Sequence, residues 1–186
     1  MGFSDDPKSV LIEHLRNHAV RTDGPFVLRS GRTSDWYIDA RQTTFSGDGA
    51  LAVGRAVLTE VPTDVVAVGG MTMGADPIAV ATAIASVGSG RVLRSFSIRK
   101  EVKDHGVGGR LVGPVAGGDS VVALEDTTTT GSALAEAIEA LREEGVDVVK
   151  AIALVDRSDG EAAVRIAALG VPYVALVVPS DFGLGS

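Results

Sequence analysis

The sequence predicts one α/β domain, spanning residues 1–186, with a mainly parallel central sheet flanked by helices. From residue 62 onward, short β-branched runs alternate with alanine-rich segments of helical pattern. The runs are apolar along their length, which is typical of parallel strands that are covered on both faces. No linker or internal repeat divides the chain, and 45% hydrophobic residues suffice for one stable core.

A helix is expected first, near the N-terminus. The stretch SDDP at residues 4–7 favours a helix start, and Val10, Leu11 and Leu15 give the following segment one apolar side. His14 and His18 lie one helical turn apart there. That spacing can hold a metal ion, but no third ligand is nearby in the sequence, and an exposed helix face explains the pair as well.

The alternating elements follow in order along the chain. Strands are expected at residues 64–70, 91–98, 120–126, 148–156 and 173–178. Helices are expected at residues 76–87, 131–145 and 159–170. In the second of these helices Leu134, Ile138 and Leu141 recur on one face, and Gly145 is a plausible C-cap. Because ligands of such sheets bind at the carboxyl ends of the strands, those ends are the expected site.

Composition excludes several classes of function. The net charge of −7 and the aromatic content of 4% argue against a nucleic-acid partner. The absence of cysteine removes disulfides, thiol nucleophiles and cysteine-based metal sites. No stretch approaches the roughly 20 apolar residues that span a bilayer, and the N-terminus does not resemble a secretory signal. We therefore expect a soluble cytoplasmic protein with neither a membrane nor a nucleic acid as partner.

The stretch VVALEDTTTTGS at residues 121–132 carries the most informative motif. Glu125 and Asp126 end an apolar strand, and a run of hydroxyls and backbone N–H groups follows at the start of a helix, where phosphates bind well. Carboxylates repel a phosphate unless they bind sugar hydroxyls or Mg²⁺, so a sugar phosphate is indicated. The phosphate-binding residues are expected to be Thr127, Thr128, Thr129, Thr130, Gly131 and Ser132.

Alternatives for this motif are weaker. The threonines alone could merely cap a helix. A nucleotide-binding Walker loop would need a lysine and an earlier glycine, and the G-x-G-x-x-G dinucleotide pattern is also missing. The two acids directly before the threonines favour a ligand site.

This motif resembles the 5-phosphoribosyl-1-pyrophosphate (PRPP) motif of the type I phosphoribosyltransferases. The resemblance implies their fold, with a small hood formed by about residues 1–45 and the C-terminal end. It also implies that Glu125 and Asp126 bind the ribose hydroxyls of PRPP, while the threonine loop binds its 5′-phosphate. Mg²⁺ is the implied cofactor, held mainly by PRPP oxygens and water, and no protein ligand for it is identified.

The segment RKEVKDHG at residues 99–106 is the most specific part of the resemblance. Its charge and glycines indicate an exposed loop or a solvated hairpin, and it closely resembles the catalytic loop of orotate phosphoribosyltransferases. Lys103 would be the principal catalytic cation, with Arg99 and His105 also on the pyrophosphate and Lys100 on PRPP. In that family loop 99–109 closes over the neighbouring active site, which implies a homodimer.

Five further residues are implied on the acceptor side. The segment FVLRSGRTSDWYIDAR at residues 26–41 resembles the orotate-side segment, which makes Arg29, Trp36 and Tyr37 candidates for orotate binding. On composition alone, Trp36 and Tyr37 would be read as part of a core strand. Arg157 in ALVDRSDGE would meet the orotate carboxylate or a carbonyl, and Thr129 is a further candidate.

The segment VGGMTMGADPIAVA at residues 68–81 resembles a pyrophosphate loop that binds through backbone N–H groups. Gly70, Met71, Thr72 and Gly74 are its candidate PRPP contacts. Many relatives have a lysine near the position of Met73, which this chain lacks, so its pyrophosphate binding must depend more on backbone donors, Mg²⁺ and the partner's loop.

The resemblance thus implies an orotate phosphoribosyltransferase of pyrimidine nucleotide biosynthesis, which makes orotidine 5′-monophosphate and pyrophosphate from orotate and PRPP. Two alternatives stay open: a phosphoribosyltransferase for another base, and a regulator on the same fold that senses PRPP without chemistry. The regulator would need a basic surface for nucleic acid, and the acidic composition counts against it.

Overall fold

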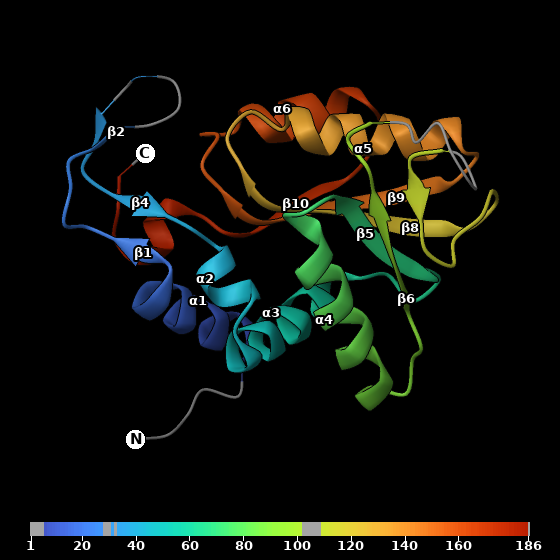
Figure 1. Cartoon of the computed structure of the whole chain (residues 1–186), viewed down its shortest axis with the longest axis horizontal. Coiled ribbons are helices and arrows are strands. Elements are labelled where there is room, and N and C mark those ends of the chain that lie inside the picture. Colours follow the sequence, from blue (N-terminus) through green and yellow to red (C-terminus); the bar gives the residue numbers. More distant parts are fainter. Residues whose placement is uncertain (1–5, 28–30, 32, 102–108, 186) are drawn as a thin grey trace.

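The computed structural model describes residues 6–27, 31, 33–101 and 109–185. Its centre is a six-stranded sheet in the order β10–β9–β8–β5–β6–β7 (Figure 1). In chain order the strands are β5 (Ala67–Met71), β6 (Arg94–Ile98), β7 (Leu111–Val112), β8 (Ser120–Thr128), β9 (Asp147–Asp156) and β10 (Tyr173–Val177). All neighbours pair in parallel except β6 and β7. The predicted fold class is confirmed.

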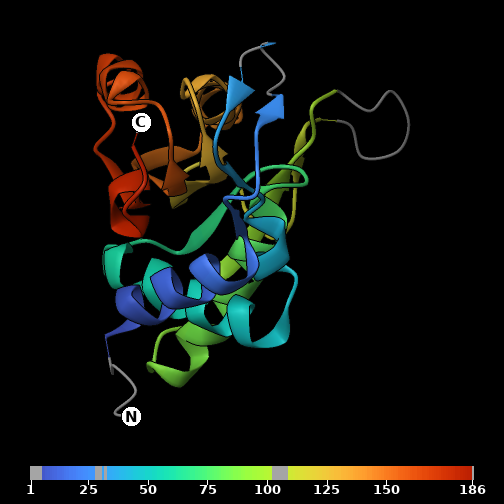
Figure 2. The same ribbon diagram turned by 90° about the vertical axis from the view of Figure 1, so that its left-hand side faces the viewer.

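Helices cover both faces of this sheet, as Figure 2 shows from the side. One layer consists of α1 (Pro7–His18), α3 (Gly47–Glu60) and α4 (Ala75–Gly88), which share a buried core with Val68, Val122 and Leu154. The other consists of α5 (Ser132–Glu143) and α6 (Glu161–Ala168), which pack on Val121 and Ala151. Burial on both faces explains why the strand sequences are apolar without alternation.

The N-terminal segment begins where the sequence predicts. Asp6 caps α1, since its carboxylate accepts the Ser9 backbone N–H at 2.9 Å. Two short antiparallel pairs follow, β1 (Val20–Arg21) with β4 (Tyr37–Ile38) and β2 (Phe26–Val27) with β3 (Thr33–Ser34). The short helix α2 (Arg41–Thr44) then leads into α3.

The C-terminal end returns to this N-terminal segment. The 3₁₀ helix η1 (Pro179–Phe182) lies beside α1, where Arg16 Nη2 donates to the carbonyl of Asp181 at 2.9 Å. Trp36 Nε1 donates to the carbonyl of Gly185 at 3.1 Å. The C-terminal end of the chain therefore lies against α1 and beside the strands β1 and β4 (Figure 1).

One strand is longer than the sequence predicts. The strand expected at 120–126 continues to Thr128, because Thr127 and Thr128 still pair with Val155 and Asp156 of β9. After β6 the sequence predicts an exposed loop or a solvated hairpin, and the described part forms the stem of a hairpin, in which the edge strand β7 pairs antiparallel with β6. Among the described residues, no helix has both the length and the apolar character needed to cross a membrane.

Candidate active site

The two predicted phosphate-side loops meet at the carboxyl edge of the sheet. The strands β5 and β8 are neighbours, and Gly70 lies opposite Leu124. The loop after β5 then passes so close to the acids that a Cβ on Gly74 would come within 2.7 Å of Asp126 Oδ1. Glycine at position 74 therefore allows the glycine loop and the acid pair to share one site.

Glu125 and Asp126 are both largely buried at this edge. Burial, followed by the charge of Asp126, raises the pKa of Glu125 to about 8, and the charge of Lys100 partly opposes this shift. Glu125 Oε2 is buried and has no hydrogen-bond partner among the described residues. A buried carboxyl oxygen without a partner is suited to a ligand that supplies hydroxyl donors or a cation.

Asp126 has a different environment from Glu125. Burial raises its pKa, and the backbone N–H of Thr127, which donates to Asp126 Oδ1 at 2.6 Å, acts in the opposite direction. The charge of Arg41 also lowers the pKa of Asp126. Arg41 itself forms an ion pair with Asp39, with 2.8 Å between Nε and Oδ1.

Asp39 and Arg41 were not among the residues that sequence reasoning assigned to the site. Both lie in the segment WYIDAR, next to the assigned Trp36 and Tyr37. The available signal was the spacing of an acid and a base two residues apart at the end of that segment. What the sequence does not reveal is that β4 directs this pair toward Asp126.

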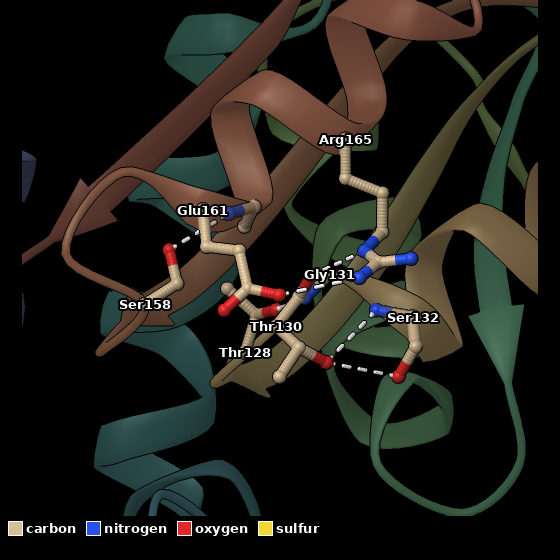
Figure 3. A network of polar contacts seen from close by, with 8 residues as sticks. Thr128, Thr130, Gly131, Ser132, Ser158, Glu161 and Arg165 are labelled. Atoms are coloured by element: carbon tan, nitrogen blue, oxygen red, sulfur yellow. Dashed lines mark hydrogen bonds and ion pairs between the residues drawn. The ribbon is translucent and has the colours of Figure 1, made fainter.

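The threonine loop forms a tight turn between β8 and α5. Gly131 has a φ of +74°, its N–H donates to Thr128 Oγ1 at 2.9 Å, and Thr130 Oγ1 donates to Ser132 Oγ at 3.0 Å (Figure 3). The helix α5 begins at Ser132. The loop thus lies at the positive N-terminal end of a twelve-residue helix, which favours an anion.

The glycine loop after β5 presents mainly backbone. The side chain of Met71 is buried in the core, so only its backbone is available to a ligand. Thr72 Oγ1 donates to Asp76 Oδ2 at 2.8 Å, and the peptide bond between Thr72 and Met73 is cis. The Met73 side chain is exposed.

Arg157 follows β9 and brings the acceptor-side candidates together. Its guanidinium carbon lies 4.1 Å from the centroid of the Trp36 ring, which is a cation–π contact. Its backbone N–H donates to the carbonyl of Thr128 at 2.8 Å. Burial lowers the pKa of Arg157, while the nearby Tyr37 acts to raise it. Its buried Nε has no partner among the described residues, so this donor is free for a ligand.

A cleft of about 450 Å³ opens beside Arg157. It runs between the loop after β9 and the C-terminal end, and it is lined by Asp156, Arg157, Asp159, Gly160, Val178, Pro179, Ser180, Leu184 and Gly185. The C-terminal end is therefore part of the surroundings of Arg157.

Three predicted site residues, Arg29, Lys103 and His105, lie outside the described residues. Arg99 and Lys100 are on the described stem of the hairpin, where the Arg99 N–H donates to the carbonyl of Arg110 at 2.9 Å. The charge of Lys100 on this stem acts to lower the pKa of Glu125.

Within the described part of the chain, no three histidine or acidic side chains gather as a metal site. His14 and His18 have ring centroids 4.3 Å apart, and His14 Nδ1 lies 3.1 Å from Thr43 Oγ1. This contact gives His14 a role in packing α1 against α2. Mg²⁺ therefore stays a prediction that rests on the chemistry of PRPP.

A mainly parallel sheet, an acid pair and a threonine loop after one strand, and a glycine loop after its neighbour together define a phosphoribosyltransferase. Residues 70–182, more than half of the chain, match the family model described as the phosphoribosyl transferase domain.

The orotate phosphoribosyltransferase of Streptomyces avermitilis is 40% identical over 181 residues, with 97% of this chain and 99% of that protein covered. That of Corynebacterium glutamicum is 41% identical, with coverage of 96% and 95%. The chain belongs to the orotate phosphoribosyltransferase family, and the resemblance predicted from its motifs is confirmed.

Solved structures agree with this assignment. The orotate phosphoribosyltransferase of Mycobacterium tuberculosis H37Rv in complex with Fe(III) dicitrate superposes with a TM-score of 0.85 at 33% identity, covering 96% of this chain and 100% of that one. The same enzyme in complex with PRPP gives a TM-score of 0.78 at 31% identity, with the same coverage.

Proposed function

We propose that this chain transfers the 5-phosphoribosyl group of PRPP to orotate, which yields orotidine 5′-monophosphate and pyrophosphate. The observation that carries the proposal is the buried acid pair, Glu125 and Asp126, between a helix-terminal threonine loop and a glycine loop. A sugar that carries a phosphate, hydroxyls and a second phosphate group matches these features in order. The phosphate matches the threonine loop, the hydroxyls match the acid pair, and the second phosphate group matches the glycine loop.

Each part of PRPP has a matching set of groups. The ribose hydroxyls bind Glu125 and Asp126, and the 5′-phosphate binds the loop from Thr127 to Ser132. The pyrophosphate binds the backbone of the loop from Gly70 to Gly74 and the Lys100 side chain. The charge of Lys100, which acts to lower the pKa of Glu125, supports its role on the same ligand.

Orotate lies on the Arg157 side of the site. Arg157 pairs with its carboxylate or a carbonyl, and Trp36, Tyr37, Thr129 and Arg29 complete the acceptor site. Arg157 Nε has no partner within the described ranges, and this free donor supports the arrangement together with the contact of Arg157 with Trp36. The Arg157 backbone N–H donates to the carbonyl of Thr128, and this link to the threonine loop supports an acceptor site beside the donor site.

The chemistry requires positioning and charge stabilisation. A ring nitrogen of orotate forms a bond to C1 of the ribose as the C1–oxygen bond to pyrophosphate breaks, and the nitrogen loses its proton. The ribose gains oxocarbenium character while negative charge collects on the leaving group, so Lys103, Arg99 and His105 act on the pyrophosphate. Mg²⁺ bound with PRPP supplies further charge neutralisation there.

We also propose a homodimer in which loop 99–109 reaches the neighbouring site. The helix α4 supports this, because its solvent side carries Val80, Ile84 and Val87 at intervals of four and three residues, and Ile84 is 67% exposed. Since α4 starts directly after the glycine loop, a partner that covers this face would lie close to the pyrophosphate site.

We propose a single catalytic domain in which residues 1–45 and the C-terminal end form the hood. The contacts of Trp36 with Gly185 and of Arg16 with Asp181 support the joint hood. We further propose a cytoplasmic location, which suits the acidic, cysteine-free composition.

The direct test follows the loss of orotate ultraviolet absorbance when protein, orotate, PRPP and Mg²⁺ are mixed. We expect a loss that depends on PRPP and Mg²⁺ and that is absent when uracil replaces orotate. PRPP binding without any orotate turnover would contradict the proposal and favour a PRPP sensor or another acceptor.

A further inference from the structure

One arginine of α6 donates a hydrogen bond to the threonine loop. Arg165 Nε donates to the carbonyl of Thr130 at 2.6 Å, and its Nη2 pairs with Glu161 Oε1 at 3.2 Å (Figure 3). Glu161 is one helical turn before Arg165, so this ion pair holds the guanidinium in place along the helix surface.

The Thr130 carbonyl belongs to the same peptide unit as the Gly131 N–H. In a trans peptide these two groups point in opposite directions. The N–H donates to Thr128 Oγ1 at 2.9 Å, while Arg165 binds the carbonyl. Hydrogen bonds therefore hold this peptide plane at both its N–H and its carbonyl group. Its orientation determines the direction in which the following backbone groups, at the start of α5, point.

The first turn of α6 also supports the loop at a second point. A Cβ on Gly131 would lie 2.9 Å from Ala162 Cα, so the loop backbone packs directly on the first turn of α6. That turn is capped by Ser158, whose Oγ accepts the Ala162 N–H at 3.0 Å. The hydrogen bond of Arg165 is thus part of a packed interface between α6 and the loop.

We propose that Arg165 is a positioning residue, which holds the Thr130–Gly131 peptide in the orientation that binds the 5′-phosphate of the sugar. This inference rests on the proposed function and adds a residue that touches neither substrate. Because the Arg165 side chain is 43% exposed, the solvent weakens the contact, and we expect a moderate effect on affinity.

The test compares three probes in calorimetry: PRPP, ribose 5-phosphate and inorganic pyrophosphate. The variants are Arg165→Met, which removes the donors, and Arg165→Lys, which keeps the charge and one possible donor. The matched control is Arg142→Met, because Arg142 also donates to a helix-end carbonyl, that of Leu169, at 2.9 Å.

We expect Arg165→Met to weaken PRPP and ribose 5-phosphate about tenfold, which equals about 1.4 kcal/mol, and to leave pyrophosphate unchanged. Arg165→Lys should recover part of the loss, and Arg142→Met should change no probe more than about twofold. In turnover, KM for PRPP should rise while kcat stays within about twofold.

Unchanged binding of ribose 5-phosphate in Arg165→Met would overturn the proposal, and so would an equal loss for all three probes, since that would indicate general disruption. The proposed function fails separately, through absent orotate turnover in the unmodified protein. A selective loss of ribose 5-phosphate would support the role of Arg165 even then.

Discussion

At the scale of single residues, the site is built from groups that are costly to bury without a ligand. Glu125 is the clearest case, since one carboxyl oxygen has no partner among the described residues and its pKa is raised to about 8. A carboxyl group of this kind binds its proton more tightly in the folded protein than in the unfolded chain. The folded state is therefore more stable at a pH where this carboxyl group is protonated, and less stable at a pH where the group must ionise.

This raised pKa predicts a pH-dependent effect of Glu125→Gln on stability. The native state holds the extra proton between the ordinary carboxyl pKa and about 8, so wild-type stability falls across that range as pH rises. Glutamine has no proton to lose there. The melting temperature of Glu125→Gln relative to wild type should therefore increase steadily from about pH 5 to pH 8.

Scanning calorimetry in a pH series measures this difference. Glu139→Gln on the exposed side of α5 is the matched control, because it removes a carboxylate from the surface. A difference between Glu125→Gln and wild type that does not change with pH would contradict the assigned environment of Glu125.

Gly131 gives a second residue-scale prediction. Gly131→Ala should lower the free energy of unfolding by more than the roughly 1–2 kcal/mol that a left-handed conformation costs, because its Cβ also meets Ala162. Gly170→Ala is the control, since Gly170 has a φ of +72° with open space around the added Cβ. Urea unfolding measures both variants. An equal decrease in the free energy of unfolding would show that the contact of the added Cβ with Ala162 does not destabilise the protein.

At the scale of elements, the strands and helices could be predicted from residue 62 onward because their apolar patterns are local. The acid pair and the threonine loop could be predicted too, since both are contiguous. Arg165 and the pair of Asp39 and Arg41 could not be predicted in the same way. Each is a polar residue at an ordinary position in its own segment, and only the packing of α6 and β4 brings it to the loop or to Asp126.

The C-terminal end also gains its role only through packing. It carries no sequence signal, yet the Gly185 carbonyl accepts the Trp36 Nε1–H, and Trp36 stacks on Arg157. Removal of residues 184–186 should raise KM for orotate several-fold, since it loosens the ring that supports Arg157, and should leave PRPP binding unchanged.

Trp36 provides a direct measurement for this truncation, because it is the single tryptophan of the chain. Its emission should shift to longer wavelength as the ring becomes more exposed. Trp36→Phe in the full-length chain is the companion variant, since it keeps an aromatic face for Arg157 and removes only the N–H donor. Unchanged emission after truncation would mean that the tail does not hold Trp36.

At the scale of the whole molecule, the proposed dimer divides each active site between two copies. Lys103→Ala and Asp126→Asn should each be nearly inactive alone, because the first removes a cation from the neighbour's site and the second removes an acid from its own. After mixing and subunit exchange, half of the dimers contain one intact site, so about one quarter of wild-type activity should return.

Turnover before and after exchange, with sedimentation to verify the dimer, measures this effect. Ile84→Glu on the apolar side of α4 is a companion variant and should shift the protein toward monomers. Absence of recovered activity in an exchanged dimer would mean that each site is complete within one chain.

The short stretch from residue 157 to residue 165 is linked to both proposed substrate sites. Arg157 at its start is in the proposed acceptor site, and Arg165 at its end donates to the loop that we propose for the donor's phosphate. If the first substrate orders this stretch on binding, the second substrate binds to a stretch that is already ordered and loses less conformational entropy. We therefore expect PRPP to tighten orotate binding, and linkage requires that orotate then tightens PRPP binding by the same factor.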